Sequence, residues 1–407
     1  MKVNNKPNVK TEHMGGVPIP STDVLKAMHR GQYILHARGG KLTEVPVEKV
    51  LLPHSNNTSP QGIQGGVDLG LDGTIYVRQP EVLCKSTDGG RTWSATPVEV
   101  PGGGAASETE FDVGLHGPRP FGTAGGLVTR LLSDGTWIVV EPGFYEVLRG
   151  PAIVWTSTDQ GRTWTKRAEI PVQIPLPDGK PGVVRGAERT LCRLQDDTLL
   201  CAFTVAPEPP ISDAPWADVV MHTFRSTDGG RTWQGPAFLG RAASEGYAIA
   251  LPSGRVLATV RYQRPKLPGD PPETDSRGFK NVFLTDSEDG GRTWSTPRQL
   301  TTVYGQTFGW PVAQSDGTVV VVHDTRYGPG FPGSRAIISR DGGTTWEDEV
   351  YCLDYTVFTG SYTASISLED GTILTIAGSS QAGNDWAAVK DNTDLYAIRW
   401  KPVARAE

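Results

Sequence analysis

The chain has 407 residues, among them 49 glycines and 32 prolines, and a formal net charge of −6. It has no basic stripe, which argues against nucleic acid as a partner, and no apolar run long enough to span a membrane. Residues 1–13 are polar and lack a signal-peptide core, so we expect a cytoplasmic protein. Four cysteines are too few for a disulfide scaffold and no Cys/His cluster has zinc spacing, so we expect reduced thiols, no metal and no other cofactor. Cys192 and Cys201 lie on the two arms of one predicted hairpin, which leaves a contact between them open.

Six two-residue turns, most of them Asp-Gly, interrupt short aliphatic runs along the chain. Asp-Gly in such a run is a strong hairpin signal, because the type I′ turn needs positive φ at both central residues. In chain order the predicted hairpins turn at residues 71–74, 133–136, 195–198, 252–255, 315–318 and 369–372.

An eight-residue motif, Ser-x-Asp-x-Gly-x-Thr-Trp, alternates with these hairpins. Its five copies begin at Ser86, Ser157, Ser226, Ser287 and Ser339. In such a turn Asp and Ser can bond local backbone donors, and Trp anchors the turn in the core. We therefore interpret the motif as structural and do not assign its carboxylates to catalysis.

Each period thus holds four strands, which we call A, B, C and D outward from the centre. Six such units predict an all-β fold, a six-bladed β-propeller of four-stranded antiparallel blades. The sixth unit lacks the motif and ends at its third strand, residues 394–400, so we expect an N-terminal strand, residues 33–37, to close the ring. We predict an N-terminal extension over residues 1–30 and a single propeller domain over residues 31–407.

In this fold the start of strand A and the end of strand B meet on the face opposite to the motifs. Nine residues before the glycine position of each hairpin stand Gln64, Gly126, Glu188, Glu245, Phe308 and Tyr362. Seven residues after it stand Pro80, Pro142, Thr204, Arg261, Asp324 and Gly378. Charged groups that converge on one mouth are the default candidate for a functional site.

From about Tyr33 onward, the chain resembles the sialidase (neuraminidase) superfamily, whose members are six-bladed propellers marked by such Asp boxes (BNR repeats). Residues 244–261 resemble the sialidase segment with a glutamate and the second carboxylate-binding arginine, and residues 360–371 resemble the stretch with the catalytic tyrosine. The resemblance implies Tyr362 as nucleophile, Glu245 as its base and Arg261 as the carboxylate clamp. A tyrosine hydroxyl with a pKa near 10 needs such a base, and sialidases are the glycosidases with a tyrosine nucleophile.

The chain departs from the sialidase pattern in blade one. Gln64 stands where the first substrate arginine is expected, and Arg78 is a nearby replacement. Sialidases carry an acid/base aspartate on the B–C loop of blade one, but this loop is short here and has no aspartate. Asp112 or His116 of the long connection 102–125 could supply the acid/base group instead.

Four further residues are candidates for substrate binding. Arg326 and Arg335 lie near the place where the sialidase pattern has its third substrate arginine. Glu188 and Asp324 are carboxylates near the mouth. A structural ion pair is an equal alternative for the His323–Arg326 segment, where the sequence reads His-Asp-Thr-Arg.

Three functions follow from these residues. The first is an exo-acting, sialidase-like glycoside hydrolase that cleaves a terminal acidic sugar from a glycan. The second is a related hydrolase or lyase that acts on uronic-acid glycans, which the departures in blade one favour. The third is a non-catalytic propeller that binds a glycan or a protein, and the sequence leaves the oligomeric state open.

Overall fold

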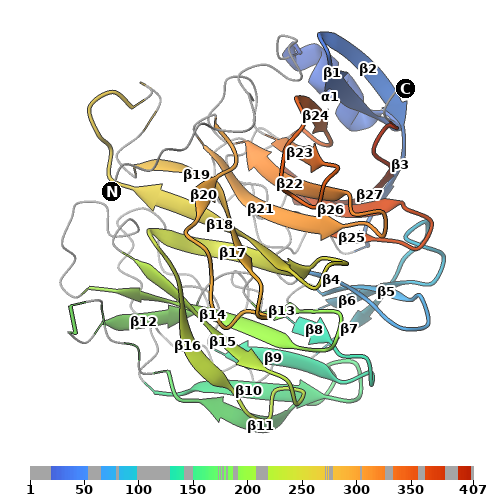
Figure 1. Ribbon diagram of the computed structural model, residues 1–407. Coiled ribbons are helices and arrows are strands. Elements are labelled where there is room, and N and C mark those ends of the chain that lie inside the picture. Colours follow the sequence, from blue (N-terminus) through green and yellow to red (C-terminus); the bar gives the residue numbers. More distant parts are fainter. Residues whose placement is uncertain are drawn as a thin grey trace.

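The computed structural model describes residues 20–53, 66–78, 82–98, 129–141, 150–172, 182–186, 191–207, 219–270, 278–302, 305–325, 333–355, 363–380 and 393–404, and residues 174, 176, 178, 179, 272 and 274. Within them lie six antiparallel sheets, which follow one another in chain order (Figure 1). This confirms the predicted all-β, six-bladed propeller.

The strands of each blade follow one another from the centre of the ring outward. Blade one has β4 (Val67–Leu69), β5 (Ile75–Arg78), β6 (Val82–Ser86) and β7 (Ser94–Pro97). Blade two has β8 (Thr129–Leu131), β9 (Trp137–Glu141), β10 (Ala152–Ser157) and β11 (Thr165–Ile170). In blade three β12 (Val183–Gly186) and β13 (Cys192–Arg193) both pair with β14 (Leu199–Ala206), and β15 (Val220–Ser226) and β16 (Gln234–Arg241) follow.

The remaining blades have the same order. Blade four has β17 (Ala243–Ala250), β18 (Val256–Arg264), β19 (Phe279–Ser287) and β20 (Arg298–Gln299). Blade five has β21 (Gln306–Ala313), β22 (Val319–Thr325), β23 (Gly333–Ser339) and β24 (Glu349–Cys352). Blade six has β25 (Thr363–Ser367), β26 (Ile373–Ser380), β27 (Thr393–Trp400) and, from the N-terminal part of the chain, β3 (Glu48–Leu51). The innermost strand β25 contacts β4 of blade one, so the ring is closed.

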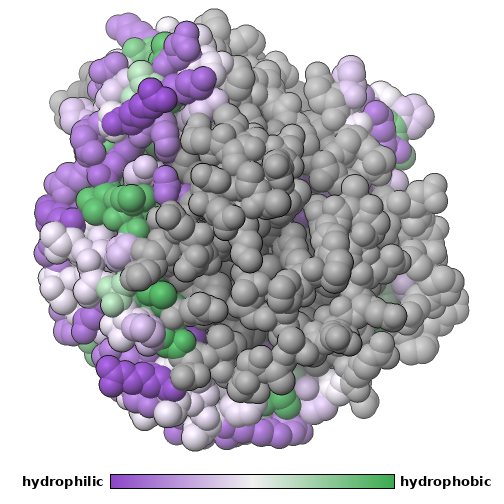
Figure 2. Space-filling view, turned by 180° about the vertical axis from the view of Figure 1, so that it is seen from behind, coloured by the Kyte–Doolittle hydropathy of each residue, from purple (hydrophilic) through white to green (hydrophobic). Residues whose placement is uncertain are grey.

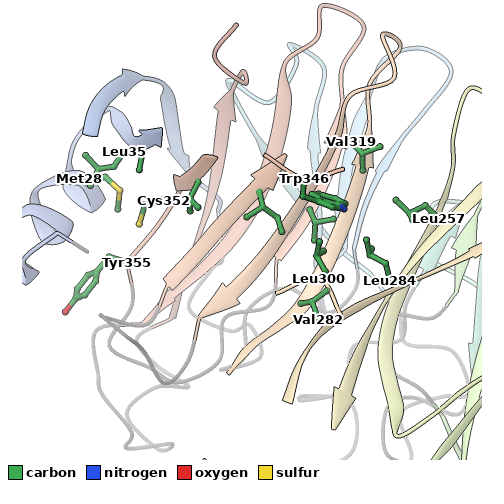
Figure 3. Close-up of a cluster of buried hydrophobic side chains, with 14 of the residues drawn as sticks. Met28, Leu35, Leu257, Val282, Leu284, Leu300, Val319, Trp346, Cys352 and Tyr355 are labelled. Carbon is green, nitrogen blue, oxygen red and sulfur yellow. The ribbon is translucent and has the colours of Figure 1, made fainter. Parts of the chain in front are cut away.

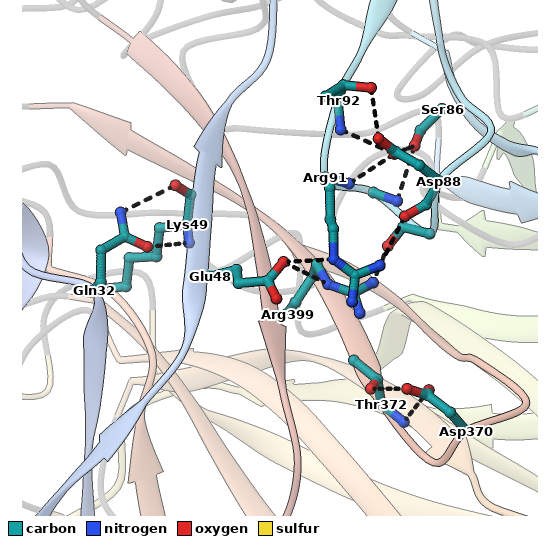
Figure 4. A network of polar contacts seen from close by, with 12 residues as sticks. Gln32, Glu48, Lys49, Ser86, Asp88, Arg91, Thr92, Asp370, Thr372 and Arg399 are labelled. Atoms are coloured by element: carbon teal, nitrogen blue, oxygen red, sulfur yellow. Dashed lines mark hydrogen bonds and ion pairs between the residues drawn. The ribbon is translucent and has the colours of Figure 1, made fainter.

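The strand that completes blade six differs from the expected one. Residues 33–37 belong to β1 (Tyr33–Arg38), which pairs with β24 and carries β2 (Lys41–Pro46) at its outer side, so blade five has six strands. The half-exposed β3 pairs with β27 instead, and its Glu48 forms an ion pair with Arg399 of β27 at 3.1 Å (Figure 4). The more apolar β1 is buried, because it packs between blade five and the helix that precedes it.

That helix, α1 (Thr22–Arg30), begins after Ser21, whose side chain accepts a hydrogen bond from the backbone N–H of Val24. Its buried residues Leu25 and Met28 belong to the same apolar cluster as Cys352. The cluster continues between blades four and five, where it includes Trp346 of the fifth motif (Figure 3).

The eight-residue motifs are the C–D turns, and their carboxylates are saturated within the turn. In blade one Asp88 Oδ1 accepts hydrogen bonds from the backbone N–H groups of Arg91 (3.0 Å) and Thr92 (2.9 Å), and Oδ2 accepts one from the Thr92 hydroxyl (2.6 Å) (Figure 4). These bonds from Thr92 hold the pKa of Asp88 well below its usual value. The motifs lie on the side of the A–B hairpins, as the bond from Gly342 N–H to Gly317 O (3.1 Å) shows. The structural interpretation of the motif is confirmed.

All four cysteines, including Cys192 and Cys201, are buried thiols outside any disulfide. Among the described residues, no helix is long and apolar enough to cross a membrane. The described part of the face in Figure 2 is mainly hydrophilic, with small and separate apolar patches.

Candidate functional site

Glu245 and Arg261 form a buried ion pair at the mouth of blade four. Glu245 lies near the start of β17 and Arg261 lies beyond the middle of β18, and 2.7 Å separates Glu245 Oε1 from Arg261 Nη1. The two residues are only 1% and 6% exposed. A buried ion pair is weak evidence for stability, because both ions must be taken out of water. Its position at the predicted mouth makes it the first candidate for a functional group.

A β-bulge shapes this part of β17. Ser244 pairs with Arg261 and Tyr247 pairs with Thr259, so two residues, Glu245 and Gly246, oppose one residue of β18. Glu245 has a φ of 45°, which is rare for a residue with a side chain. A Cβ atom on Gly246 would lie 2.3 Å from the Thr259 carbonyl oxygen, so only glycine fits there. Bulges and strained residues are common next to active sites, where they aim a side chain.

Blade five repeats this arrangement at Phe308. Its φ is 54°, and the register of β21 on β22 shifts between Thr307 and Trp310. Asp324, at the ring position of Arg261, accepts hydrogen bonds at Oδ1 from the Thr307 backbone N–H (3.1 Å) and hydroxyl (2.7 Å). Asp324 is 1% exposed, and these bonds show that it fixes the bulge of its own blade.

Arg261 connects the two bulges. Its guanidinium carbon lies 5.9 Å from the centre of the Phe308 ring, so the arginine contacts Glu245 on its own blade and an aromatic ring on the next. Such cation–π contacts favour a fixed guanidinium plane. The ring-position count therefore selected residues that the structure does bring together.

Two further polar residues lie near the end of β18 and were missed from the sequence. Gln263 pairs with Lys280 of β19, and these side chains are 2% and 3% exposed. The sequence does contain a signal for Gln263. Thr259, Arg261 and Gln263 are polar residues at every second position, which places them on one face of a strand.

Two other candidate arginines that the structure describes, Arg78 and Arg335, make contacts of their own. The guanidinium of Arg78 lies 5.6 Å from the ring centre of Trp164, against the motif of blade two, and burial lowers its pKa to about 10. Arg335 lies inside blade five, opposite His323 and Cys352, and is 2% exposed. Burial lowers the pKa of Arg335, and the Cys352 thiol is a hydrogen-bond partner. Arg78 thus contacts the adjacent blade and Arg335 a strand of its own blade, and neither of these contacts involves Glu245 or Arg261.

Several expected site residues lie outside the described residues. They are Gln64, Asp112, His116, Glu188, Arg326 and Tyr362. Their roles stay predictions.

A second polar group at the centre of the ring was also missed. Arg130 of β8 lies 3.7 Å from Asp68 of β4, measured from Nη1 to Oδ2, and its guanidinium lies 5.1 Å from the centre of the Tyr247 ring. Tyr247 stacks on Trp310 with 3.8 Å between ring centres. In the sequence, Asp68 and Arg130 each stand five residues before their hairpin glycine, where other blades have apolar residues.

No group of three His, Cys, Asp or Glu side chains that could hold a metal ion occurs in the part of the chain that the structure describes. Among the described residues, the mouth presents the carboxylate of Glu245, the guanidinium of Arg261 and the ring of Phe308 beside it.

A profile of the BNR repeat-like domain family matches residues 135–376, which is more than half of the chain. The chain belongs to the BNR repeat-like domain family. This confirms the resemblance to the sialidase and BNR superfamily. No curated protein matches the chain significantly.

Several solved structures have a similar fold. A protein of unknown function from Dyadobacter fermentans superposes with a TM-score of 0.57 at 16% identity, over 87% of this chain and 98% of the other. An α-L-arabinofuranosidase from Fusarium graminearum, in complex with an iminosugar inhibitor, gives 0.57 at 15% identity over 86% and 96%. A Hadza microbial sialidase gives 0.53 at 16% identity over 89% and 69%. At these identities the likeness establishes the fold.

Proposed function

We propose that this protein is a glycoside hydrolase that releases terminal sugars from glycans, with Glu245 in its active site. The observation that carries the proposal is the Glu245–Arg261 pair, buried at the mouth and held by a bulge with a strained glutamate. Strain and buried charge are costly, and a functional site is where such costs are retained. The sialidase and the arabinofuranosidase of similar fold support the same class of reaction.

In the first form of this function the sugar is acidic, as in sialic acid. Tyr362 is the nucleophile, Glu245 takes its proton, and Arg261 binds the substrate carboxylate. Asp112 protonates the leaving oxygen. A neutral nucleophile suits an anionic substrate, because a carboxylate nucleophile would repel it.

The Glu245–Arg261 contact itself favours a second form with a neutral sugar. The charge of Arg261 is already matched by Glu245 at 2.7 Å, which reduces its attraction for a substrate carboxylate. Glu188 stands at the same ring position of the adjacent blade. Two carboxylates on either side of a glycosidic bond are the usual machinery of glycosidases, one as acid and one as nucleophile or base.

A panel of substrates separates these forms. We would incubate the purified protein with an aryl α-sialoside, with an aryl α-L-arabinofuranoside and with uronate-containing oligosaccharides. Release of the aryl group from the sialoside supports the acidic-sugar form, and release from the arabinofuranoside supports the neutral form. New ultraviolet absorbance from an unsaturated uronate would indicate lyase chemistry instead of hydrolysis. No turnover on any substrate, together with binding of one, would leave a glycan-binding protein.

Variants then test the residues. Tyr362→Phe abolishes turnover in the first form and leaves it largely intact in the second. Glu188→Gln leaves turnover largely intact in the first form and abolishes it in the second. Glu44→Gln, at an exposed position of β2, is the matched control and should keep wild-type rates.

A further inference from the structure

Four side chains from four blades meet at the centre of the ring, and we call Asp68, Arg130, Tyr247 and Trp310 the central network. Arg130 Nη1 lies 3.7 Å from Asp68 Oδ2 and donates a hydrogen bond to the Thr129 carbonyl at 2.6 Å. Its guanidinium carbon lies 5.1 Å from the Tyr247 ring centre and 5.7 Å from that of Trp310. The network therefore joins blades one, two, four and five.

The network is packed into the centre of the ring, with Tyr247 partly buried and the other three members buried. Arg130 and Trp310 are each 1% exposed, and Trp310 Nε1 donates to the Ser365 carbonyl of blade six at 2.8 Å. A Cβ atom on Gly66 would lie 2.4 Å from Arg130 Nη1, so the backbone before β4 lies directly against the guanidinium. Burial raises the pKa of Tyr247 to about 12, although the Arg130 charge opposes this, so its hydroxyl is protonated at neutral pH.

Stability alone does not require these charges. The same register position is filled by apolar side chains in the other four blades, namely Cys192, Ile249, Val312 and Ile366. A buried ion pair can often be replaced by apolar residues without loss of stability. We therefore ask which neighbouring part of the chain the central network holds in position.

The connection to the mouth runs through Tyr247. Glu245, Gly246 and Tyr247 are consecutive, and the bulge interrupts the ladder between β17 and β18 at the first two. A bulged residue is left out of the regular ladder bonds, so its position depends on the residues that flank it. Tyr247 is the first residue after the bulge that pairs again, and its ring is held by Arg130 and Trp310.

We propose that Arg130 is a positioning residue, which through the ring of Tyr247 fixes the bulged segment that presents Glu245 at the mouth. The expected effect of Arg130 on catalysis rests on the proposed function, whereas its expected effect on the backbone of the bulged segment does not.

The test compares Arg130→Met, Tyr247→Leu and their double variant with Arg399→Met. Arg399 is a matched control, because it is also buried and ion-paired across strands, but it contacts Glu48 and the Gly89 carbonyl on the motif side. Hydrogen exchange, measured by mass spectrometry, reports on the peptide 243–250. We expect Arg130→Met and Tyr247→Leu each to speed exchange there at least tenfold, and the double variant to add less than threefold. Exchange in Arg130→Met that is no faster than in Arg399→Met, or additive effects in the double variant, would overturn the proposal.

Kinetics provide the second measurement on whichever glycoside the wild type cleaves. We expect Arg130→Met to lower kcat at least tenfold with KM within threefold, and Arg399→Met to keep kcat at a temperature where it is folded. A wild-type kcat in Arg130→Met overturns the proposal and leaves the proposed function standing. An inactive wild type refutes the proposed function, and the exchange measurement still decides the inference. If Arg130→Met does not fold, Arg130→Lys keeps the charge but loses the guanidinium over the Tyr247 ring, and it takes the same test.

Discussion

Glu245 is ion-paired with Arg261 at 2.7 Å although Ser244, and not Glu245, is the register partner of Arg261. The bulge produces this offset, because it adds one residue to β17 and turns the Glu245 side chain toward the β18 arginine. Phe308 also has a positive φ in a bulge of blade five, and the centre of its ring lies 5.9 Å from the guanidinium carbon of Arg261. The mouth thus contains two similar β-bulges, which carry different side chains.

The first prediction concerns the charge of Glu245. Glu245→Gln keeps the shape of the side chain and removes its basicity, so we expect activity to fall by about 10²–10⁴-fold. Both Glu245→Gln and Glu245→Ala leave Arg261 buried without its carboxylate, which should cost about 3–5 kcal/mol in the free energy of unfolding. Steady-state kinetics and urea denaturation measure the two effects. Full activity in Glu245→Gln would remove this residue from the mechanism.

The second prediction separates the motifs from the site. Asp228→Ala removes hydrogen bonds to the backbone N–H groups of Arg231 and Thr232 and to the hydroxyl of Thr232. We expect a loss of about 1–2 kcal/mol in stability, as for a lost cap, with kcat unchanged. Thermal denaturation and kinetics on the same preparation check this. A large fall in kcat at a temperature where the variant is folded would contradict the structural role of the motif.

The third prediction concerns stability in acid. Glu349 is buried in blade five and accepts hydrogen bonds from Tyr351, from Arg340 (3.1 Å) and from His36 (3.1 Å, in the tautomer or charge state that donates). Burial alone would raise its pKa, but hydrogen bonds from His36, Tyr351 and Arg340 lower it from 4.5 to about 2. A carboxyl whose pKa is lower in the folded state contributes stability above its unfolded pKa, and this contribution is lost as the pH falls.

We therefore expect the free energy of unfolding to decrease between about pH 5 and pH 2, and to decrease less in Glu349→Gln. The difference between the two proteins removes the contribution of the motif aspartates, which both share. Parallel pH profiles would show that Glu349 does not have the lowered pKa.

The fourth prediction tests ring closure by β3. A chain without residues 1–52 loses α1, β1, β2 and β3, which uncovers β27 and the buried Ala397 and Ile398. An open edge next to an apolar face favours aggregation, so we expect little soluble folded protein. A chain without residues 1–19 keeps every element that the structure describes and should retain the wild-type melting temperature. Expression, gel filtration and circular dichroism compare the two, and a stable monomer lacking β3 would contradict its role.

Much of the fold was predictable because its signals are local. Hairpin turns and motif turns depend on the φ requirements of a few neighbouring residues, so their repeats could be counted in the sequence, and the count placed Glu245 and Arg261 at one mouth. The choice between residues 33–37 and β3 as the closing strand was not local. It depends on which surface each segment meets, since β1 is covered by α1 and blade five while Glu48 of β3 meets Arg399.

The sequence by itself determined the number of blades, the structural role of the motif aspartates and the ring positions from which a site could be built. Only the tertiary structure decided which side chains contact one another. Arg78 and Arg335 look equivalent to Arg261 as letters, but their guanidinium groups contact Trp164 and Cys352. The central network, in the same way, joins residues from β4 to β21 that are far apart in the chain. Contacts of this kind arise only when the ring closes, because no local dihedral preference encodes them.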